Sequence, residues 1–472
     1  MYRTKFCPGK LLILMTILSL LSFILKKEQH VLNPTSNSST KRTEQEMFER
    51  ENPYFPYEAF KMKRFVRNCN HFPTFHTISF DNSYWQVANL KSTTIYIFSA
   101  HFDNRTYPTI RVLAETVGRI NQLTTKCYLW FSINRAPVIT DIKLTYLYGK
   151  PSFYTKKHSL YTFPVVISCL IPKRDNIPIS ISIAESNCSR ISNNIKIYSA
   201  NSNEKSGVSV CLKGLQYNSD MSKQLTEWIE INKELGIAKM TFYIYNIHPK
   251  TKQLLEKYTE SGSIDMLPIT IPGRVPNTYF MRKELFDATV RAWVHEIVPI
   301  NDCYFRNMNI YQYVLVIDID ELIVPKKHRT LTEMINSISN SFTSLSFSEV
   351  YFWSNNTKCI EGTSCDLYYF QRTLRSPKYF LDTRASGHYK SLHNTDKVVW
   401  VGHHYEGGCV SKCERRYVST DIAHNQHYRE TCELEIQSEC NNKYRNGSYD
   451  ERLLWRYMDS VIIKVAKMLE YL

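Results

Sequence analysis

The chain has 472 residues, with 59 Lys and Arg against 44 Asp and Glu, and so carries a formal net charge of +15. An apolar fraction of 43% excludes a largely disordered protein, and 14 glycines exclude a collagen-like repeat. At about 150 residues per domain, the length predicts two or three domains. The positive charge is compatible with nucleic acid, an anionic membrane or a phosphate-bearing substrate, and does not distinguish among them.

An uncharged apolar run, Leu11–Leu25, stands near the N-terminus and follows three basic residues, Arg3, Lys5 and Lys10. As a helix it covers about 22 Å, less than the ~30 Å core of a typical bilayer, so it is either a cleaved signal peptide or a short signal anchor. The run ends in large apolar residues and two lysines, not in the small residues of a cleavage site, which favours an uncleaved anchor. We therefore expect a single-pass type II membrane protein of the Golgi, with residues 1–10 in the cytosol and the rest in the lumen.

The cysteines and glycosylation sequons fit an oxidising lumen. Of the 13 cysteines only Cys7 precedes the apolar run, which leaves an even number after it, as a set of disulfides requires. The close pairs are Cys359 with Cys365, Cys409 with Cys413, and Cys432 with Cys440. A zinc site of Cys409 and Cys413 with His403 or His404 is a rival interpretation, although its spacing matches no familiar zinc pattern. Sequons stand at Asn37, Asn104, Asn187, Asn355 and Asn446, so we expect a luminal glycoprotein.

Two segments separate the apolar run from the C-terminal half. Residues 26–81 are polar and lack apolar periodicity, which predicts a flexible stem. Residues 82–206 contain β-branched and aromatic runs such as Ser92–Ala100 and Phe163–Ile171, separated by turn residues. This pattern predicts an antiparallel β-rich accessory region. It holds no obvious catalytic cluster, and we expect it to give structural support.

Residues 207–472 alternate between strand-like and helix-like segments. The expected strands include Val208–Leu212 and Met240–Asn246, and the expected helices are Met221–Leu235, one that opens at Pro249 and ends at Gly262, a long stretch from Tyr279 to about Glu296, and a C-terminal amphipathic helix from Leu453 to Leu469. Repeated strand–helix–strand units predict an α/β domain with a mainly parallel sheet flanked by helices.

The most informative segment is the apolar strand Val314–Ile317, which is followed by Asp318, Asp320 and Glu321. Because side chains alternate along an extended chain, the two aspartates project on the same side. Two carboxylates at the end of a buried strand repel each other unless a cation lies between them. They therefore predict a Mg²⁺ or Mn²⁺ site with room for a substrate phosphate, at the edge of the sheet where α/β proteins bind ligands.

This segment has two other interpretations. Ordinary carboxylates that cap a helix or pair with arginine also produce Asp-x-Asp by chance. A phosphatase-type aspartate nucleophile follows an apolar strand too, but Leu322 stands where that motif has Thr or Val. The remaining interpretation is transfer of a sugar from a nucleotide diphosphate, in which a metal stabilises the charge on the departing diphosphate.

Several pieces of the chain together resemble one family. They are FSAHFDNR (Phe98–Arg105), VCLKGL (Val210–Leu215), FYIYN (Phe242–Asn246), YTESGSID (Tyr258–Asp265), NDCYFRN (Asn301–Asn307), YVLVIDIDELIVP (Tyr313–Pro325) and HNQHYR (His424–Arg429). In order and spacing they resemble glycosyltransferase family 92, which is similar to galactosyltransferases that use UDP-galactose and Mn²⁺ on glycan acceptors. The resemblance implies a GT-A-type nucleotide-sugar-binding fold. Gly214 stands where proline is expected, and residues 371–391 match poorly, which leaves the acceptor open.

The resemblance also implies a metal site. Asp318 and Asp320 correspond to the metal and diphosphate motif, and His427 stands where a third metal ligand is expected. His403 and His404 form a second histidine candidate for that role. An imidazole ligand suits Mn²⁺ better than Mg²⁺.

Further residues are candidates for binding the nucleotide sugar and for catalysis. Lys390 and Arg429 are expected to pair with the diphosphate, and Asp302 to lie near the nucleotide. An inverting transferase needs a base that deprotonates the acceptor hydroxyl, and Glu406 is the residue we expect in that role.

We therefore expect a metal-dependent, inverting glycosyltransferase that moves a hexose, galactose by the resemblance, from a UDP-sugar to a glycan acceptor in the secretory pathway. A catalytically inactive luminal protein that binds carbohydrate or acts as a scaffold is one alternative. A metal-dependent phosphoesterase that uses the same carboxylates is another. Nucleic-acid binding is disfavoured, because no basic run with interleaved aromatic residues is present.

Overall fold

The computed structural model describes residues 43–62, 69–148, 162–172, 176–186, 191–200, 202, 204–287, 289–338, 341–353, 367–376, 389–429 and 447–470. The chain divides into two units, residues 1–48 and residues 49–472, and helix α2 (Glu44–Glu51) runs across the division. The expected anchor Leu11–Leu25 lies outside the described residues. Within the ranges given above, every helix is too short or too polar to cross a membrane. The elements described below belong to the second unit.

The folded part of this unit begins before residue 82. Helix α3 (Tyr57–Phe60) and the 3₁₀ helix η1 (Phe75–Thr77) precede the first strand. Tyr54 and Phe55 are buried, and the carbonyl oxygen of Tyr54 accepts a hydrogen bond from the amide of Lys196 at 3.0 Å. The described part of the segment that we expected to end the stem therefore packs on the β-rich region, because its aromatic side chains complete that region's core.

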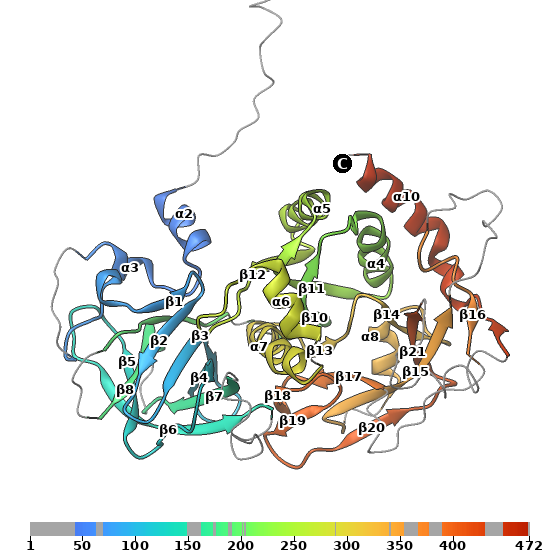
Figure 1. Ribbon diagram of the computed structural model, residues 1–472. Coiled ribbons are helices and arrows are strands. Elements are labelled where there is room, and N and C mark those ends of the chain that lie inside the picture. The colour runs from blue at the N-terminus through green and yellow to red at the C-terminus, as the bar shows by residue number, and fades with distance from the viewer. Residues whose placement is uncertain are drawn as a thin grey trace, which may run out of the picture. The chain divides into compact units, whose positions relative to one another are not determined.

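The β-rich region is a nine-stranded sheet in the order β1-β2-β3-β4-β7-β6-β5-β8-β9, and β9 also pairs with β3 (Figure 1). Its strands are β1 (Phe80–Asn82), β2 (Trp85–Asn89), β3 (Thr94–Asp103), β4 (Thr109–Thr116), β5 (Thr125–Trp130), β6 (Val138–Tyr146), β7 (Phe163–Leu170), β8 (Ser180–Glu185) and β9 (Ile195–Tyr198). Neighbours along this order are antiparallel, whereas β3 and β9 are parallel. A disulfide between Cys127 and Cys169 joins β5 to β7.

The second half begins with four parallel strands in the order β12-β11-β10-β13. These are β10 (Val208–Tyr217), β11 (Ile237–Ile247), β12 (Ile264–Pro268) and β13 (Tyr313–Val316), joined through helices α4 (Ser222–Glu234), α5 (Pro249–Glu260), α6 (Tyr279–Asp287) and α7 (Thr289–Asn307). Parallel neighbours need crossover connections, and helices supply them here. The single long helix that we expected from Tyr279 is instead two helices, of which the second ends at Asn307.

Beyond β13 the same sheet continues with strands that run in both directions. The elements are β14 (Glu321–Pro325), α8 (Leu331–Asn336), β15 (Ser344–Trp353), β16 (Leu374–Arg375), β17 (Tyr389–Asn394), β20 (Arg415–Val418), β21 (Ala423–Arg429) and β22 (Tyr449–Asp450), followed by η5 (Leu453–Tyr457) and α10 (Met458–Leu469). β17 pairs antiparallel with both β13 and β15, whereas β20 and β21 pair parallel with β15. The sheet is therefore mixed and not mainly parallel as expected, because a strand's apolar pattern does not encode its direction.

A separate hairpin of β18 (Val398–Val401) and β19 (Glu406–Cys409) lies beside α7 (Figure 1). The side-chain amide of Asn301 in α7 donates to the carbonyl of Val401 at 2.8 Å, and its oxygen accepts from the amide of Val401 at 3.0 Å. This reciprocal pair fixes the end of β18 against the helix.

The β-rich region and the second half share one of the hydrophobic clusters, while each also has a cluster of its own. Trp85 and Phe98 from the β-rich strands are buried in the same cluster as Val298 and Tyr304 from α7. These side chains belong to one cluster although they come from opposite sides of residue 206 in the sequence, so the two regions pack as one body.

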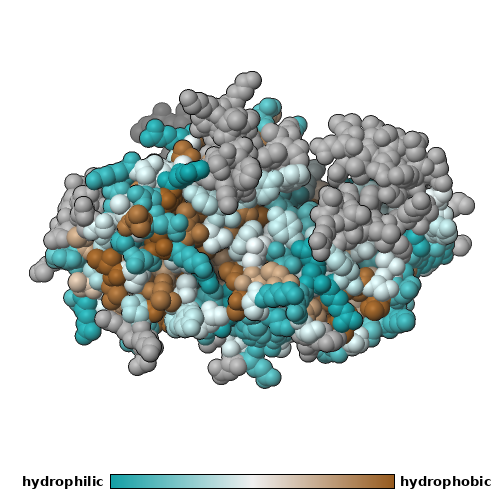
Figure 2. Space-filling model, turned by 90° about the horizontal axis from the view of Figure 1, so that it is seen from below, coloured by the Kyte–Doolittle hydropathy of each residue, from teal (hydrophilic) through white to brown (hydrophobic). Residues whose placement is uncertain are grey.

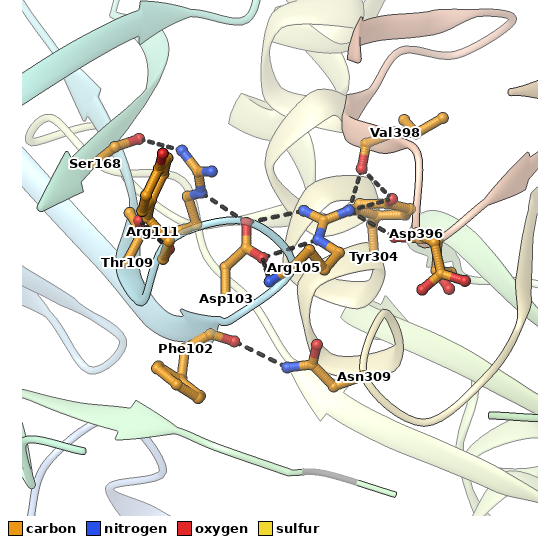
Figure 3. Close-up of polar contacts among 12 residues, drawn as sticks. Phe102, Asp103, Arg105, Thr109, Arg111, Ser168, Tyr304, Asn309, Asp396 and Val398 are labelled. Carbon is orange, nitrogen blue, oxygen red and sulfur yellow. Dashed lines mark hydrogen bonds and ion pairs between the residues drawn. The ribbon is translucent and has the colours of Figure 1, made fainter. Parts of the chain in front are cut away.

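Arg105 reinforces this junction (Figure 3). Its Nε donates to Oδ1 of Asp103 at 2.8 Å, and its Nη1 donates to the hydroxyl of Tyr304 at 3.2 Å. Nη1 also donates to the carbonyl oxygens of Thr395, at 2.6 Å, and Val398. One buried guanidinium thus ties the end of β3 to α7 and to the first residue of β18.

Apolar side chains also reach the surface of the β-rich region. Figure 2 shows brown patches over that half of the lower face, and the exposed apolar residues of the region include Leu123, Ile139 and Leu170. One face of an antiparallel sheet is commonly solvated, and here that surface is partly apolar.

Candidate active site

The two aspartates lie in a short turn between β13 and β14, at the edge where the parallel strands β10 and β13 end. The amide of Glu321 donates to the carbonyl of Asp318 at 3.1 Å, and the amide of Asp318 donates to Oε2 of Glu321 at 3.2 Å. The side chains of Asp318 and Asp320 remain 24% and 30% exposed. Two carboxylates are therefore presented at the edge of the sheet, as the strand pattern predicts.

Two lysines hold Asp318. Nζ of Lys390, in β17, donates to its Oδ2 at 2.7 Å, and Nζ of Lys213, in β10, lies 3.3 Å from its Oδ1. Burial acts to raise the pKa of Asp318, but the two ammonium groups outweigh it and hold the pKa well below its usual range. Asp318 in turn raises the pKa of the Lys213 ammonium group. This carboxylate stays ionised.

His427 lies next to Asp320. In the β14–β21 pairing His427 stands opposite Glu321, so its imidazole reaches the turn. Its Nε2 is 3.2 Å from Oδ2 of Asp320, while its Nδ1 contacts Oε1 of Glu349 and lies 3.4 Å from Oε1 of Glu321. Burial acts to raise the pKa of Asp320, and the contact with His427 outweighs it, so the pKa is lowered.

This arrangement fits a divalent cation. Glu321, Glu349 and His427 each offer a ligand atom within 4.8 Å of the others, but both glutamates are buried. Asp320, whose side chain is 30% exposed, meets the other side of the ring, with Oδ2 at 3.2 Å from Nε2 of His427. The two glutamates contact the opposite ring nitrogen, as carboxylates that orient a metal-binding histidine do.

A second charged group lies beside the lysines. Oε1 of Glu296, in α7, is 3.5 Å from Nζ of Lys213, and its Oε2 is 3.2 Å from Nε2 of His403, in the loop between β18 and β19. Burial acts to raise the pKa of Glu296, but Lys213 and His403 outweigh it and lower the pKa. Asp318, Lys213, Glu296 and His403 thus form a continuous line of polar contacts.

A disulfide fixes the two elements that carry this line. Cys211 in β10 is bonded to Cys303 in α7. Lys213 lies two residues after the first cysteine, and Glu296 lies two helical turns before the second. The crosslink therefore restrains the distance between the strand and the helix near the site.

The structure brings several of the predicted site residues together. Asp318, Asp320, His427 and Lys390 form one cluster, and Nε of Arg429 lies 3.9 Å from Oδ2 of Asp320 at its edge. Lys390 contacts Asp318 and also lies 3.2 Å from Oε2 of Glu321, so in this structure its charge is matched by carboxylates.

Asp302 lies elsewhere, and the prediction that it is near the nucleotide is corrected. Its side chain is 0% exposed, with Oδ1 at 2.8 Å from Nε2 of His101 in β3. Its Oδ2 accepts from the hydroxyl of Tyr243 at 2.5 Å and from Nε of Arg306 at 2.6 Å. With both oxygens occupied inside the protein, Asp302 links the β-rich region to α7.

Glu406 is also bound within the protein. Its side chain is 5% exposed, and its Oε2 accepts from the hydroxyl of Ser344 at 2.7 Å and contacts Arg415 at 3.2 Å. A general base has to reach the acceptor hydroxyl, which this buried carboxylate does not. The prediction of Glu406 as the base is therefore corrected.

The zinc interpretation is wrong for Cys409 and Cys413, because these two cysteines form a disulfide. The other close cysteine pairs lie outside the described residues. Asn104, the sequon asparagine within the described ranges, is exposed in the loop after β3.

Sequence reasoning missed three members of the site. Lys213 stands within the quoted VCLKGL piece, but nothing local indicates that its side chain reaches Asp318. Glu296 and Glu349 stand in a helix and a strand without a distinctive motif. Lys213 and Glu349 come close through the β10–β13 and β15–β21 pairings, and Glu296 through the packing of α7 beside β10, so all three depend on contacts between residues far apart in the sequence.

The comparison with family models identifies the class. The model of Glycosyltransferase family 92 matches residues 206–464. The protein Beta-1,4-galactosyltransferase galt-1 of Caenorhabditis elegans is 30% identical over 137 residues, which are 28% of this chain and 28% of that protein. Solved structures of S. aureus TarS 1-349 are similar at a lower level. The complex with UDP has a TM-score of 0.24 and 12% identity, covering 47% of this chain and 60% of that one. The complex with UDP-GlcNAc has a TM-score of 0.25 and 14% identity, covering 48% and 60%.

These TM-scores are too low to relate the folds in detail, and the match to galt-1 spans just over a quarter of that protein. The family model, in contrast, covers more than half of the chain and includes Asp318, Asp320 and His427. The chain belongs to glycosyltransferase family 92.

Proposed function

We propose that this protein transfers a hexose from a UDP-sugar to a glycan acceptor, with the help of a divalent metal and with inversion at the anomeric carbon. The observation that carries the proposal is the pair of Asp320 and His427 at the carboxyl edge of the parallel strands, backed by two buried glutamates. Membership of glycosyltransferase family 92 supports glycosyl transfer as the reaction class.

A Mn²⁺ or Mg²⁺ ion would be held by Asp320 and His427, with Asp318 next to them. The mixed oxygen and nitrogen donor set favours Mn²⁺. When bound, the metal supplies positive charge that stabilises the departing diphosphate. Glu349 and Glu321 keep the imidazole oriented through its other nitrogen. Arg429, at the edge of the cluster, supplies a second positive charge for the phosphates.

Lys213 and Lys390 prepare the site for an anionic donor. Their ammonium groups both contact Asp318, so this carboxylate is already neutralised by the protein and leaves Asp320 as the carboxylate facing outward. Lys390 is 7% exposed and lies between Asp318 and Glu321, which gives it a positioning role. The GT-A-type arrangement of donor and metal is part of this proposal, and the four parallel strands are compatible with it.

Galactose as the transferred sugar is proposed from the similarity to galt-1 over 137 residues. We also propose that the protein acts in the lumen of the Golgi, held by Leu11–Leu25 as a type II anchor, with residues 1–10 as a cytosolic tail. The disulfides Cys127–Cys169, Cys211–Cys303 and Cys409–Cys413 support an oxidising compartment.

The test is a donor panel. Purified luminal protein is incubated with Mn²⁺, a mixture of glycan acceptors and one UDP-sugar at a time, and release of UDP is followed. We expect one UDP-hexose to be consumed, with a β-linked product if the donor is α-linked. Asp320→Asn is expected to abolish turnover, whereas Asp421→Asn, an exposed aspartate in the loop before β21, serves as the matched control and retains it. If the folded wild type consumes none of the UDP-sugars, the proposal is refuted.

A further inference from the structure

The line of polar contacts ends at a histidine that the metal cluster does not use. His403 lies in the loop between β18 and β19, with its side chain 17% exposed, and its Nε2 is 3.2 Å from Oε2 of Glu296. Glu296 in turn is 3.5 Å from Lys213, which contacts Asp318. His403 is therefore connected to the proposed donor site by three successive polar contacts, while remaining outside the cluster of Asp320 and His427.

The contact with Glu296 favours one tautomer of the His403 imidazole. A neutral imidazole has one N–H and one lone pair. Nε2 lies 3.2 Å from the Glu296 carboxylate but outside hydrogen-bond alignment, and the nearby negative charge favours the tautomer with its proton on Nε2. Nδ1 then carries the lone pair, and among the described residues no side chain or backbone group hydrogen-bonds to it. A carboxylate behind a histidine whose other nitrogen can accept a proton is the arrangement by which hydrolases activate a hydroxyl group.

The neighbouring histidine shows the contrasting case. Nδ1 of His404 lies 2.8 Å from the carbonyl oxygen of Tyr389, and burial lowers the pKa of His404 to about 3. His404 therefore has a structural partner and stays neutral. His403, one residue before it, has a carboxylate neighbour at Nε2 and leaves Nδ1 for a substrate.

An aromatic surface lies on the same side of α7. Trp293 precedes Glu296 by three residues, so the two share one face of the helix, and Trp293 is 42% exposed. Its ring centroid is 6.4 Å from that of Tyr148, just beyond β6 of the β-rich region, in an edge-on arrangement. Exposed aromatic rings offer a flat apolar face to the C–H side of a sugar ring, with polar groups free to bind its hydroxyls.

The geometry points to His403 as the general base of the transfer, Glu296 as the residue that positions it, and Trp293 with Tyr148 as the surface that holds the acceptor glycan. This assignment rests on the proposed function. Nδ1 of His403 takes the proton of the acceptor hydroxyl while the oxygen of that hydroxyl forms a bond to the anomeric carbon. The bond from that carbon to the diphosphate oxygen breaks, and its electron pair leaves with UDP. The imidazolium, stabilised by Glu296, then returns its proton to water.

The hairpin that carries His403 is fixed at both ends of β18. Arg105 holds the carbonyl of Val398, and Asn301 holds both backbone groups of Val401. Figure 3 shows the first of these anchors, which arises from the β-rich region. The β-rich region therefore contributes to the acceptor side of the site through the position of this hairpin as well as through Tyr148.

The experiment measures the effects on the acceptor and on the UDP-sugar separately. His403→Gln keeps an amide nitrogen near the position of Nε2 and removes Nδ1, so it tests the base without removing the group that faces Glu296. We expect its kcat for transfer to p-nitrophenyl glycoside acceptors to fall about 100-fold or more, with the KM for the UDP-sugar and the affinity for UDP with Mn²⁺ unchanged. His71→Gln, the same change at an exposed histidine, is expected to behave as wild type.

Trp293→Ala tests the acceptor surface. We expect the KM for the acceptor to rise several-fold, with the KM for the donor unchanged. Thermal melting of each variant within 2–3 °C of wild type, roughly the effect of 1 kcal/mol, establishes that it is folded. If His403→Gln is folded and transfers within about threefold of the wild-type kcat, or loses UDP affinity in parallel, His403 is not the base. An unchanged acceptor KM in Trp293→Ala overturns the acceptor surface. A wild type that consumes no nucleotide sugar refutes the proposed function instead, and this assignment with it.

Discussion

Replacing Arg105 with methionine tests whether one side chain holds the β-rich region to the rest of the protein. The Arg105 side chain is 4% exposed, as is that of Asp103, with which it forms a buried ion pair. Burial acts to raise the pKa of Asp103, but Arg105 and then Arg111 outweigh it and lower the pKa to about 2 from the ordinary 3.8. This difference corresponds to about 2 kcal/mol of folding free energy at neutral pH. Methionine removes the main contributor and keeps much of the apolar stem.

The other side of the guanidinium adds to the loss. The hydroxyl of Tyr304 and the carbonyls of Thr395 and Val398 would be left without this donor, at a cost of about 1–3 kcal/mol in total. We therefore expect Arg105→Met to lower the free energy of unfolding by about 3–5 kcal/mol, as is usual when one partner of a buried ion pair is removed.

Urea denaturation followed by tryptophan fluorescence measures this change as a shift in the midpoint at constant slope. Arg135→Met, the same change at an exposed arginine, should stay within about 0.5 kcal/mol of wild type. Because the folded-state pKa of Asp103 is depressed, its contribution is present above about pH 4 and is lost as the pH falls through about 2, and the variant should show less of this acid loss. A destabilisation below 1 kcal/mol, or one equal to that of Arg135→Met, would refute the reasoning.

Three further predictions concern other parts of the molecule. Cys303→Ala, which removes the crosslink to Cys211, should lower the free energy of unfolding by about 2–5 kcal/mol. Urea titrations with and without reductant should show that wild type, which also contains Cys127–Cys169 and Cys409–Cys413, loses at least this much on reduction. Burial raises the pKa of Glu227 to about 7 although three backbone amides of residues 368–370 donate to it, so stability should fall by roughly 3 kcal/mol as the pH rises from 4.5 through 7. Glu227→Gln should remove this slope, and a slope equal to that of wild type would contradict the assignment. Mn²⁺ at 100 times its Kd should stabilise wild type by about 2.7 kcal/mol in a melting assay. It should not stabilise Asp320→Asn, provided that this variant melts at the same Tm as wild type without Mn²⁺. Equal stabilisation of both proteins would place the ion elsewhere.

The sequence predicts the centre of the site well, because its geometry is local. Asp318 and Asp320 follow a buried strand, and the alternation of side chains is enough to place both at its end. The family resemblance points to His427 and positive charge points to Lys390, and the structure brings both to the aspartates. The existence of the β-rich region likewise follows from a local period of two.

Other features depend on contacts that no local pattern carries. Glu296 lies in a helix with ordinary amphipathic spacing, and only the packing of α7 beside β10 brings it to Lys213. Glu406 and Asp302 look like free carboxylates in the sequence, yet arginine and hydroxyl partners from distant elements occupy them. The mixed sheet could not be foreseen for the same reason, because strand direction is decided by tertiary connections.

The core that Trp85 and Phe98 share with α7 makes the family-matched segment dependent on what precedes it. A fragment cut near residue 206 would leave Val298 and Tyr304 facing water, and would expose an apolar surface that favours aggregation. The two regions should therefore denature cooperatively, in one transition and not in two. Substitutions in the β-rich strands can reduce transfer without touching a substrate, and trimmed versions intended for crystallisation should begin before Tyr54, whose ring packs on Phe98 at 4.6 Å.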